Sequence, residues 1–362
     1  MVPASSRVAR PGEVVCPLSL RVDELACMLN FELADHPVYD GGELQWFDDE
    51  AHGRGMLVFL SRREDRRIDY YLETGLRVDP AGYEIGGGIG SWTQVAFDIA
   101  RLVVTDHGVD AEVAFTDRDG RLVEVRVDDR DGKPRRPAGL LAPVSAAIER
   151  PVSLLMVWMP RFDLVRTTGA PPVIRIGGTA ASTGRLPGRW LHRRHLIKYA
   201  APVVTIELNP ARAAAGSVGP PGHHLLLDQA GVREVIAEHA GHRARLRSDP
   251  AVPDLANLTD GASGSGRWSI EIDETRLTGG AWTVTRTGDD VAMELHVDER
   301  WKPGPLPWLM RLVTTVVPVF RRWPTTYRWR ADVALRGEPE LIARWERTGD
   351  ERGESYRSTT RS

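Results

Sequence analysis

The chain of 362 residues carries 47 Lys and Arg against 50 Asp and Glu, which gives a formal net charge of −3. This near balance argues against a dedicated nucleic-acid-binding protein, which would show a basic domain or stripe. Only Cys16 and Cys27 occur, too few for a disulfide framework and typical of a reducing compartment.

The apolar segments also narrow the class of protein. The first thirty residues lack the uninterrupted apolar run of a signal peptide. The longest apolar segments, 140–148 and 306–320, contain Pro or charge and fall short of the roughly 20 residues that a membrane helix needs. We therefore expect a cytoplasmic protein without a membrane span. The abundance of Arg and Ala over Lys suggests a bacterial source.

The N-terminal part of the chain is expected to be an arm followed by strands. Residues 1–30 predict an N-terminal arm that ends in a short helix over 22–30, where apolar residues have helical spacing. Apolar segments between polar turns then predict a β-meander, with strands at 43–47, 55–61 and 68–72.

The glycine-rich stretch 86–90 follows the meander. Such a loop could cradle a phosphate, but the dinucleotide fingerprint needs a helix after the glycines. Another strand pattern, 95–104, follows here instead, which favours a wide turn in a β domain.

A β-hairpin is predicted in the middle of the first half. Apolar and polar residues alternate over 109–115 and 122–127, and the turn-rich segment 116–120 joins the two runs. The acidic pair Asp128-Asp129, a Pro-bearing run, an apolar block and a strand at 153–158 come next. These elements complete a first β domain over 31–176.

The same order of elements recurs later in the chain. A strand at 293–297 precedes the acidic pair Asp298-Glu299, a Pro-bearing loop, an apolar block and a strand at 327–335. The offset between the acidic pairs, 298 − 128 = 170 residues, suits a duplicated domain rather than a solenoid repeat. The alternative to a duplicated domain is that two unrelated amphipathic hairpins resemble each other by chance.

The second domain is expected over 185–347, with a disordered tail at 348–362. A helix inserted at 228–240 is predicted, because Asp228 can cap it, Gly241 can end it and apolar residues share one face. The fold class is therefore all-β, with two tandem antiparallel barrels or sandwiches and one inserted helix.

Several short segments resemble the tandem lipocalin-like (calycin) proteins. They are Phe97-Asp98, Asp119-Gly120-Arg121, Pro137 to Pro143, Trp158-Met159 and Phe162-Asp163. This group includes the carotenoid 1,2-hydratases, the AttH-like proteins and some pericyclase-type cyclases. The resemblance implies two adjoining barrels with an apolar pocket, and either acid–base chemistry on a polyene or polyketide-like molecule or simple binding of it. No catalytic residue can be carried over by motif.

Histidine and acidic residues on the late strands are candidates for proton transfer. His296 and Glu294 alternate with apolar residues and share one strand face, and Asp332 lies on the next predicted strand. A neighbouring carboxylate can orient an imidazole for general acid–base work. If the apolar face packs the core, however, the pair faces solvent.

Other histidines allow weaker interpretations. Two pairs have His-x-x-His spacing, His192/His195 and His239/His242, which can bind a metal when both lie on one helix face. Arg193-Arg194 and a helix end at Gly241 argue against this, so no metal and no cofactor are expected. His223-His224 before Asp228 is a further possible base.

Aromatic residues are the better clue to a ligand. Eight of the 11 Trp lie from Trp190 onward, and a large aromatic cluster forms either a core or a pocket wall. The pocket hypothesis names Trp158, Trp308, Trp323, Tyr327 and Trp329 as ligand-binding residues.

The sequence thus favours binding of a small apolar isoprenoid or polyketide-like molecule in an aromatic-lined cavity. Cofactor-free hydration, isomerisation or cyclisation is possible there, with His296, Glu294 or Asp332 handling a proton. A non-catalytic carrier or stress-related binding protein with the same fold is the alternative, and a structural module would have no cavity. The oligomeric state stays open.

Overall fold

The structure is a computed structural model, and it describes most of the chain. The described residues are 7–10, 12–80, 88–130, 132–144, 148–167, 170–184, 194–210, 223–229, 231–302, 311, 314–315, 320 and 322–348. The predicted tail lies almost wholly outside these ranges, as do Gly86, Gly87, His192 and Trp308.

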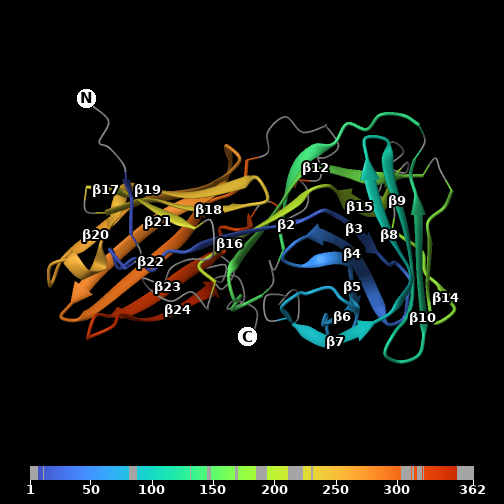
Figure 1. The fold of residues 1–362 in the computed structure, drawn as a ribbon, viewed down its shortest axis with the longest axis horizontal. Coiled ribbons are helices and arrows are strands. Elements are labelled where there is room, and N and C mark those ends of the chain that lie inside the picture. The colour runs from blue at the N-terminus through green and yellow to red at the C-terminus, as the bar shows by residue number, and fades with distance from the viewer. Residues whose placement is uncertain are drawn as a thin grey trace, which may run out of the picture.

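Three β-sheets make up the described part of the chain (Figure 1). One sheet has nine strands, in the order β1 (Arg7–Val8), β17 (His224–Asp228), β18 (Gly231–His239), β19 (His242–Pro253), β20 (Ser263–Ile272), β21 (Thr275–Thr287), β22 (Asp290–Glu299), β23 (Tyr327–Ala334) and β24 (Glu340–Arg347). We call this sheet the C-terminal half.

The other two sheets form the N-terminal half. The five-stranded sheet has the order β14 (Thr179–Ala180), β13 (Val173–Ile176), β10 (Leu122–Asp128), β9 (Gly108–Thr116) and β8 (Phe97–Thr105). The ten-stranded sheet has the order β2 (Leu20–Leu25), β16 (Val203–Leu208), β12 (Leu154–Arg166), β15 (Arg194–Ala200), β3 (Cys27–Glu32), β4 (Tyr39–Asp49), β5 (Gly53–Arg62), β6 (Ile68–Glu73) and β7 (Ile89–Val95), with β11 (Ala138–Ala142) paired to β12. This sheet curls into a half-barrel (Figure 1).

The all-β prediction is confirmed, and so are most predicted strands. The meander appears as β4, β5 and β6, each paired antiparallel with the next. The predicted hairpin is β9 and β10, with Leu122 opposite Thr116 and Asp128 opposite Asp110. No helix of the described residues is long and apolar enough to cross a membrane.

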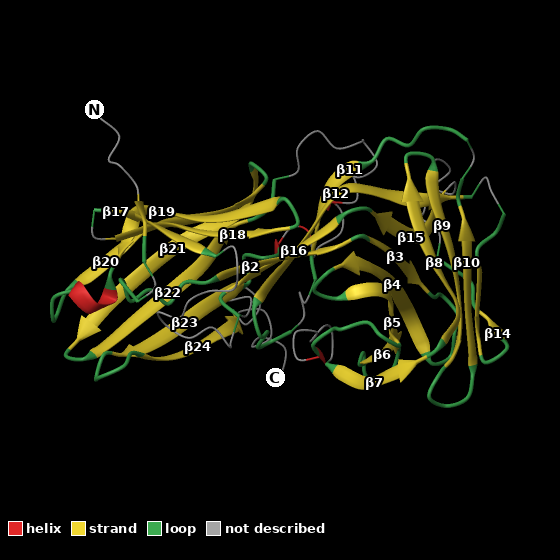
Figure 2. Cartoon of the chain, viewed as in Figure 1, coloured by secondary structure: helices red, strands yellow, loops and turns green. Residues whose placement is uncertain are grey.

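The predicted helix at 228–240 is wrong. The segment forms β17 and β18 instead, and the only helical element whose bounds are described is a 3₁₀ turn, Leu255–Asn257 (Figure 2). A β-bulge between Val232 and Glu234 places Val232 and Val235 on the same, inward side of β18, and Ile236, which points to the opposite side, is also buried. This spacing of three and four residues imitates a helix.

Asp228, which was expected to begin that helix, is the last residue of β17, and Gly241, which was expected to end it, lies in a turn. Ala240 and Gly241 have φ values of 50° and 87° and join β18 to β19 in a two-residue turn of the type I′ kind. The predicted helix at 22–30 is also wrong, because β2 and β3 occupy this stretch on either side of Ala26. β2 pairs along its whole length with the distant strand β16, and residues 28–31 of β3 pair with the distant strand β15.

The strands do not separate at the boundary predicted between the two domains. The ten-stranded sheet contains β3 to β7 and also β15 and β16, which come after residue 185. The elements that recur in the same order along the chain also do not pair with one another in the same way. β22 pairs directly with β23, whereas β10 and β12, which hold the corresponding positions, lie in different sheets.

The two faces of the ten-stranded sheet pack into two different hydrophobic cores. Its outer face, with Leu44, Val58 and Tyr71, shares one core with the five-stranded sheet. Its inner face, with Phe59 and Tyr70, belongs to a second core that continues through β11, β12, β2 and β16 into the nine-stranded sheet. The inner face of the half-barrel therefore adjoins the junction between the two halves.

Candidate functional site

The predicted proton-transfer residues lie on the outer surface of the nine-stranded sheet. His296 and Asp332 are exposed, on β22 and β23. Glu294 Oε1 lies 2.9 Å from Arg330 Nε on the neighbouring strand, within a surface rich in ion pairs. All three side chains alternate with buried residues and face away from the core.

The predicted ligand-binding aromatics are buried instead. Trp323, Tyr327 and Trp329 are at most 4% exposed, and Trp158 contacts Trp301 edge-on with ring centroids 6.0 Å apart. Trp329 lies opposite Leu295 on the inward side of the sheet, whereas Glu294 pairs with Arg330 on the outward side. The structure does not bring the predicted acid–base set and the predicted aromatic set together.

The described histidines of the two His-x-x-His pairs lie on or beside strands rather than on a helix, and His192 lies outside the described residues. His239 and His242 are cross-strand partners that flank the β18–β19 turn. His195 is buried with its Nδ1 3.0 Å from Thr183 Oγ1, and His224 is exposed at the start of β17. Among the described residues, no three His, Cys, Asp or Glu side chains are arranged to hold a metal ion.

A row of side chains crosses the inner face of the ten-stranded sheet, and sequence reasoning missed it. Strand pairing aligns one residue from each of seven adjacent strands, and we call this set the inner-face row. Its members, in order, are Leu164, Lys198, Asn30, Glu43, Phe59, Tyr70 and Trp92. Cross-strand neighbours in a sheet stand about 5 Å apart, close enough for their side chains to interact.

The centre of the row is a clamped carboxyl group. Asn30 Nδ2 donates to Glu43 Oε2 at 3.1 Å, and Gln45 Nε2 donates to Glu43 Oε1 at 2.7 Å. Burial raises the pKa of the Glu43 carboxyl, although the two amide donors and the charge of Lys198 oppose the rise. Glu43 therefore holds its proton at a higher pH than an ordinary glutamate.

The other end of the row is an aromatic wall. Tyr70 stacks on Trp92 with ring centroids 4.3 Å apart and planes 5° from parallel, and Phe59 meets Tyr70 at 5.6 Å. Aromatic faces carry partial negative charge and attract cations. The Glu43 carboxyl group and this wall, in which Tyr70 is fully buried and Phe59 is 7% exposed, are thus adjacent on one face.

Glycines just before Glu43 allow the strands to approach closely where the sheet curls. A Cβ on Gly42 would stand 2.7 Å from the Phe31 ring and 2.9 Å from the Phe59 carbonyl oxygen, and one on Gly41 would stand 2.8 Å from the Phe31 carbonyl oxygen. A β-bulge between Tyr39 and Gly41 accompanies this close contact. The local sequence therefore fixes where Glu43 lies.

No family model, curated protein or solved structure matches the chain. The chemistry of the inner-face row is accordingly read from its own residues.

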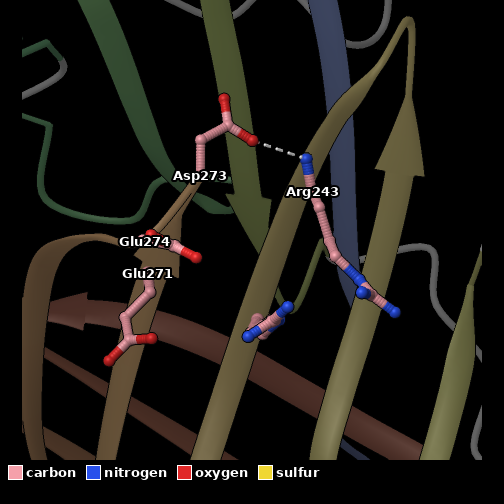
Figure 3. Close-up of a pocket in the computed structure, with 5 residues that line it drawn as sticks. Arg243, Glu271, Asp273 and Glu274 are labelled. Carbon is pink, nitrogen blue, oxygen red and sulfur yellow. Dashed lines mark hydrogen bonds between the residues drawn. The ribbon is translucent and has the colours of Figure 1, made fainter.

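A shallow polar hollow of about 300 Å³ lies on the nine-stranded sheet (Figure 3). Arg243, Arg245, Glu271, Asp273 and Glu274 line it. Several of these charges already have partners in the sheet, such as Arg243 with Glu238 at 2.7 Å. The hollow has no aromatic lining, so it suits an apolar ligand less well than the inner-face row does.

Proposed function

We propose that the chain binds a small apolar molecule, of isoprenoid or polyketide-like structure, on the inner face of the curled sheet, and that Glu43 transfers a proton to it. The observation that carries this proposal is a carboxyl group of raised pKa, held by Asn30 and Gln45, beside the wall of Phe59, Tyr70 and Trp92. The proposed activity is a cofactor-free hydration, isomerisation or cyclisation.

A protonated carboxyl group can start each of these reactions. Glu43 gives its proton to one carbon of a C=C bond, and the positive charge forms on the neighbouring carbon. In hydration, water adds to that carbon and returns a proton to the Glu43 carboxylate. In isomerisation, a carbon beside the cation loses one of its protons to the Glu43 carboxylate. In cyclisation, a second C=C bond first attacks the cation, and a carbon beside the new cation then loses a proton to the same carboxylate. The aromatic wall stabilises the cation in each case.

The fold we propose for this function is a divergent pair of lipocalin-like barrels. The half-barrel of the ten-stranded sheet and the second core that joins it to the nine-stranded sheet support this proposal. A cytoplasmic location is part of it, and the two free, buried cysteines Cys16 and Cys27 are consistent with a reducing compartment.

A polyene probe tests binding. Titration with all-trans-retinol should quench tryptophan fluorescence, and Trp92→Phe should weaken this quenching, because Trp92 lies in the inner-face row. Trp46→Phe is the matched control, since Trp46 lies on the same sheet but packs toward the outer-face core. Equal effects of the two variants, or no quenching in the wild type, would reject the site.

Deuterium incorporation tests the chemistry. Incubating geranylgeraniol with the protein in D₂O should place deuterium at vinylic or allylic carbons, as mass spectrometry would detect. Glu43→Gln should retain retinol binding and slow incorporation by about 10²- to 10⁴-fold, the usual contribution of a general acid. Retinol binding without incorporation in the wild type would point to the alternative function, a non-catalytic carrier.

A further inference from the structure

Three histidines meet carboxylates where the N-terminal and C-terminal halves pack together. We call His52, His239 and His242 the seam histidines. His52 lies in the turn between β4 and β5, and the other two flank the β18–β19 turn. Their partners Asp23 and Glu24 are on β2, which belongs to the ten-stranded sheet and packs against β18 and β19.

Both ring nitrogens of His242 face carboxylates. Nε2 lies 3.0 Å from Glu24 Oε2, and Nδ1 lies 2.5 Å from Asp273 Oδ2. The other oxygen of Asp273 accepts the backbone N–H of Arg243 at 2.9 Å, which holds this carboxylate at the rim of the polar hollow (Figure 3). A neutral imidazole has one N–H and one lone pair, so only the imidazolium can donate to both carboxylates.

His52 also lies between two carboxylates. Its Nδ1 lies 3.0 Å from Asp49 Oδ2, and its Nε2 lies 3.5 Å from Asp23 Oδ2. The second oxygen of Asp23 lies 3.5 Å from His239 Nε2. Asp23 therefore stands between one histidine from each half of the molecule.

We propose that the seam histidines form a pH-dependent latch, which holds β2 against the β18–β19 hairpin when they are protonated and loosens when they lose their protons. Histidine is the side chain whose charge ordinarily changes between about pH 5 and 8. The stabilising contacts are present at low pH and are lost as the pH rises. A neutral His242 leaves the lone pair of one nitrogen facing a carboxylate oxygen, which is repulsive.

Other described charged groups also lie beside these carboxylates, and Arg243 and Arg245 line the same hollow as Asp273. On β2, Arg21 Nη2 lies 3.3 Å from Asp23 Oδ2. On β16, burial raises the pKa of Glu207, Arg21 opposes the rise, and the charge of Asp23 adds to it. On β18 and β19, Glu238 and Arg243 pair with each other at 2.7 Å. Negative charge is therefore in excess around the seam once the histidines are neutral.

Hydrogen exchange of the full chain tests the latch. Amides of 20–25 and 231–253 should lose about fivefold of their protection between pH 6 and pH 8, after correction for the intrinsic exchange rate. This size is that of a few partly exposed ion pairs. The triple variant His52→Gln, His239→Gln, His242→Gln should show no such change, and His107→Gln, an exposed histidine on the β8–β9 turn, should keep it.

Glu24→Gln gives a second test that needs no loss of histidine. The Gln amide can donate to the lone pair on His242 Nε2 while His242 Nδ1 still donates to Asp273. We expect the 231–253 amides of this variant to be as protected at pH 8 as those of the wild type at pH 6. Equal protection of the wild type at pH 6 and pH 8, or an unaltered pH dependence in both variants, would overturn the proposal.

Discussion

Asp128 and Asp129 are adjacent, yet their environments predict opposite effects of pH on stability. Asp129 is 2% exposed, and its Oδ1 accepts the backbone N–H of Arg166 at 3.1 Å and faces Arg135 Nη2 at 3.1 Å. Its Oδ2 has no hydrogen-bond partner. Burial raises the Asp129 pKa to about 6, although Arg135 and Arg166 oppose the rise. Asp128 is exposed and bonded to Arg130, which lowers its pKa to about 2.

The rise in the Asp129 pKa sets the size of the effect. Its ordinary value is 3.8, and at about 1.36 kcal/mol per pKa unit the rise to about 6 corresponds to roughly 3 kcal/mol. Below about pH 4 the group is protonated in both the folded and the unfolded chain. Between about pH 4 and pH 6 the folded chain binds more protons, so the free energy of unfolding falls as the pH rises.

Urea unfolding of Asp129→Asn isolates this effect. The variant keeps the size of the side chain and removes its titration, while the loss of the charge beside Arg135 adds an offset that does not depend on pH in this range. The unfolding free energy of the wild type minus that of Asp129→Asn should fall by about 2 kcal/mol between pH 4 and pH 7, which is most of the full effect.

Asp128→Asn is the matched control for this measurement. Because the Asp128 pKa is lowered, its stabilising contribution is complete above about pH 4 and is lost only as the pH falls further. The difference between wild type and Asp128→Asn should therefore be flat from pH 4 to pH 7. A flat difference for Asp129→Asn as well would refute the reasoning from burial.

Two further predictions concern a turn and a predicted catalytic residue. Ala240→Asn should raise the free energy of unfolding, measured in urea, by about 0.5–1 kcal/mol. The reason is that Ala240 has φ 50° in a turn that favours Asn-Gly. No gain in the free energy of unfolding would mean that this turn is not under strain. His296→Ala should leave both the thermal unfolding temperature and the rate of deuterium incorporation unchanged, because the side chain is exposed on the outer side of the nine-stranded sheet. Loss of incorporation in this variant would instead assign the proton transfer to His296 and contradict the role of Glu43.

Strands with strict alternation could be predicted from the sequence, and a strand with a bulge could not. In β10 every second residue is buried, and β9 shows the same alternation from Ala111 to Thr116, so the hairpin follows directly from the pattern. In β18 the bulge after Val232 gives the buried residues helical spacing, and the turn residues beside it imitate helix caps. Turn chemistry and cap chemistry use the same residue types, so the sequence alone favoured the wrong element.

The candidate site required the register of strands far apart in the chain. Asn30, Glu43 and Lys198 each look like solvent-facing residues of ordinary strands. Only the pairing of β15, β3 and β4 places them in one row, on the same face of the sheet as Phe59 and Tyr70. By contrast, the apolar alternation around His296 correctly allowed for a solvent-facing pair. The aromatic clusters could be recognised from composition, but their separation from the acidic residues could not.

Infrared titration of Glu43 tests the central claim most directly, because the proposed proton transfer requires a carboxyl group that stays protonated where ordinary glutamates are ionised. A protonated carboxyl band should persist in the wild type to a higher pH than that of an ordinary glutamate, and should be absent in Glu43→Gln. Buried Asp129 gives a similar signal, so Asp129→Asn serves as the background protein for both measurements. Identical spectra with Glu43 present and replaced would contradict the account.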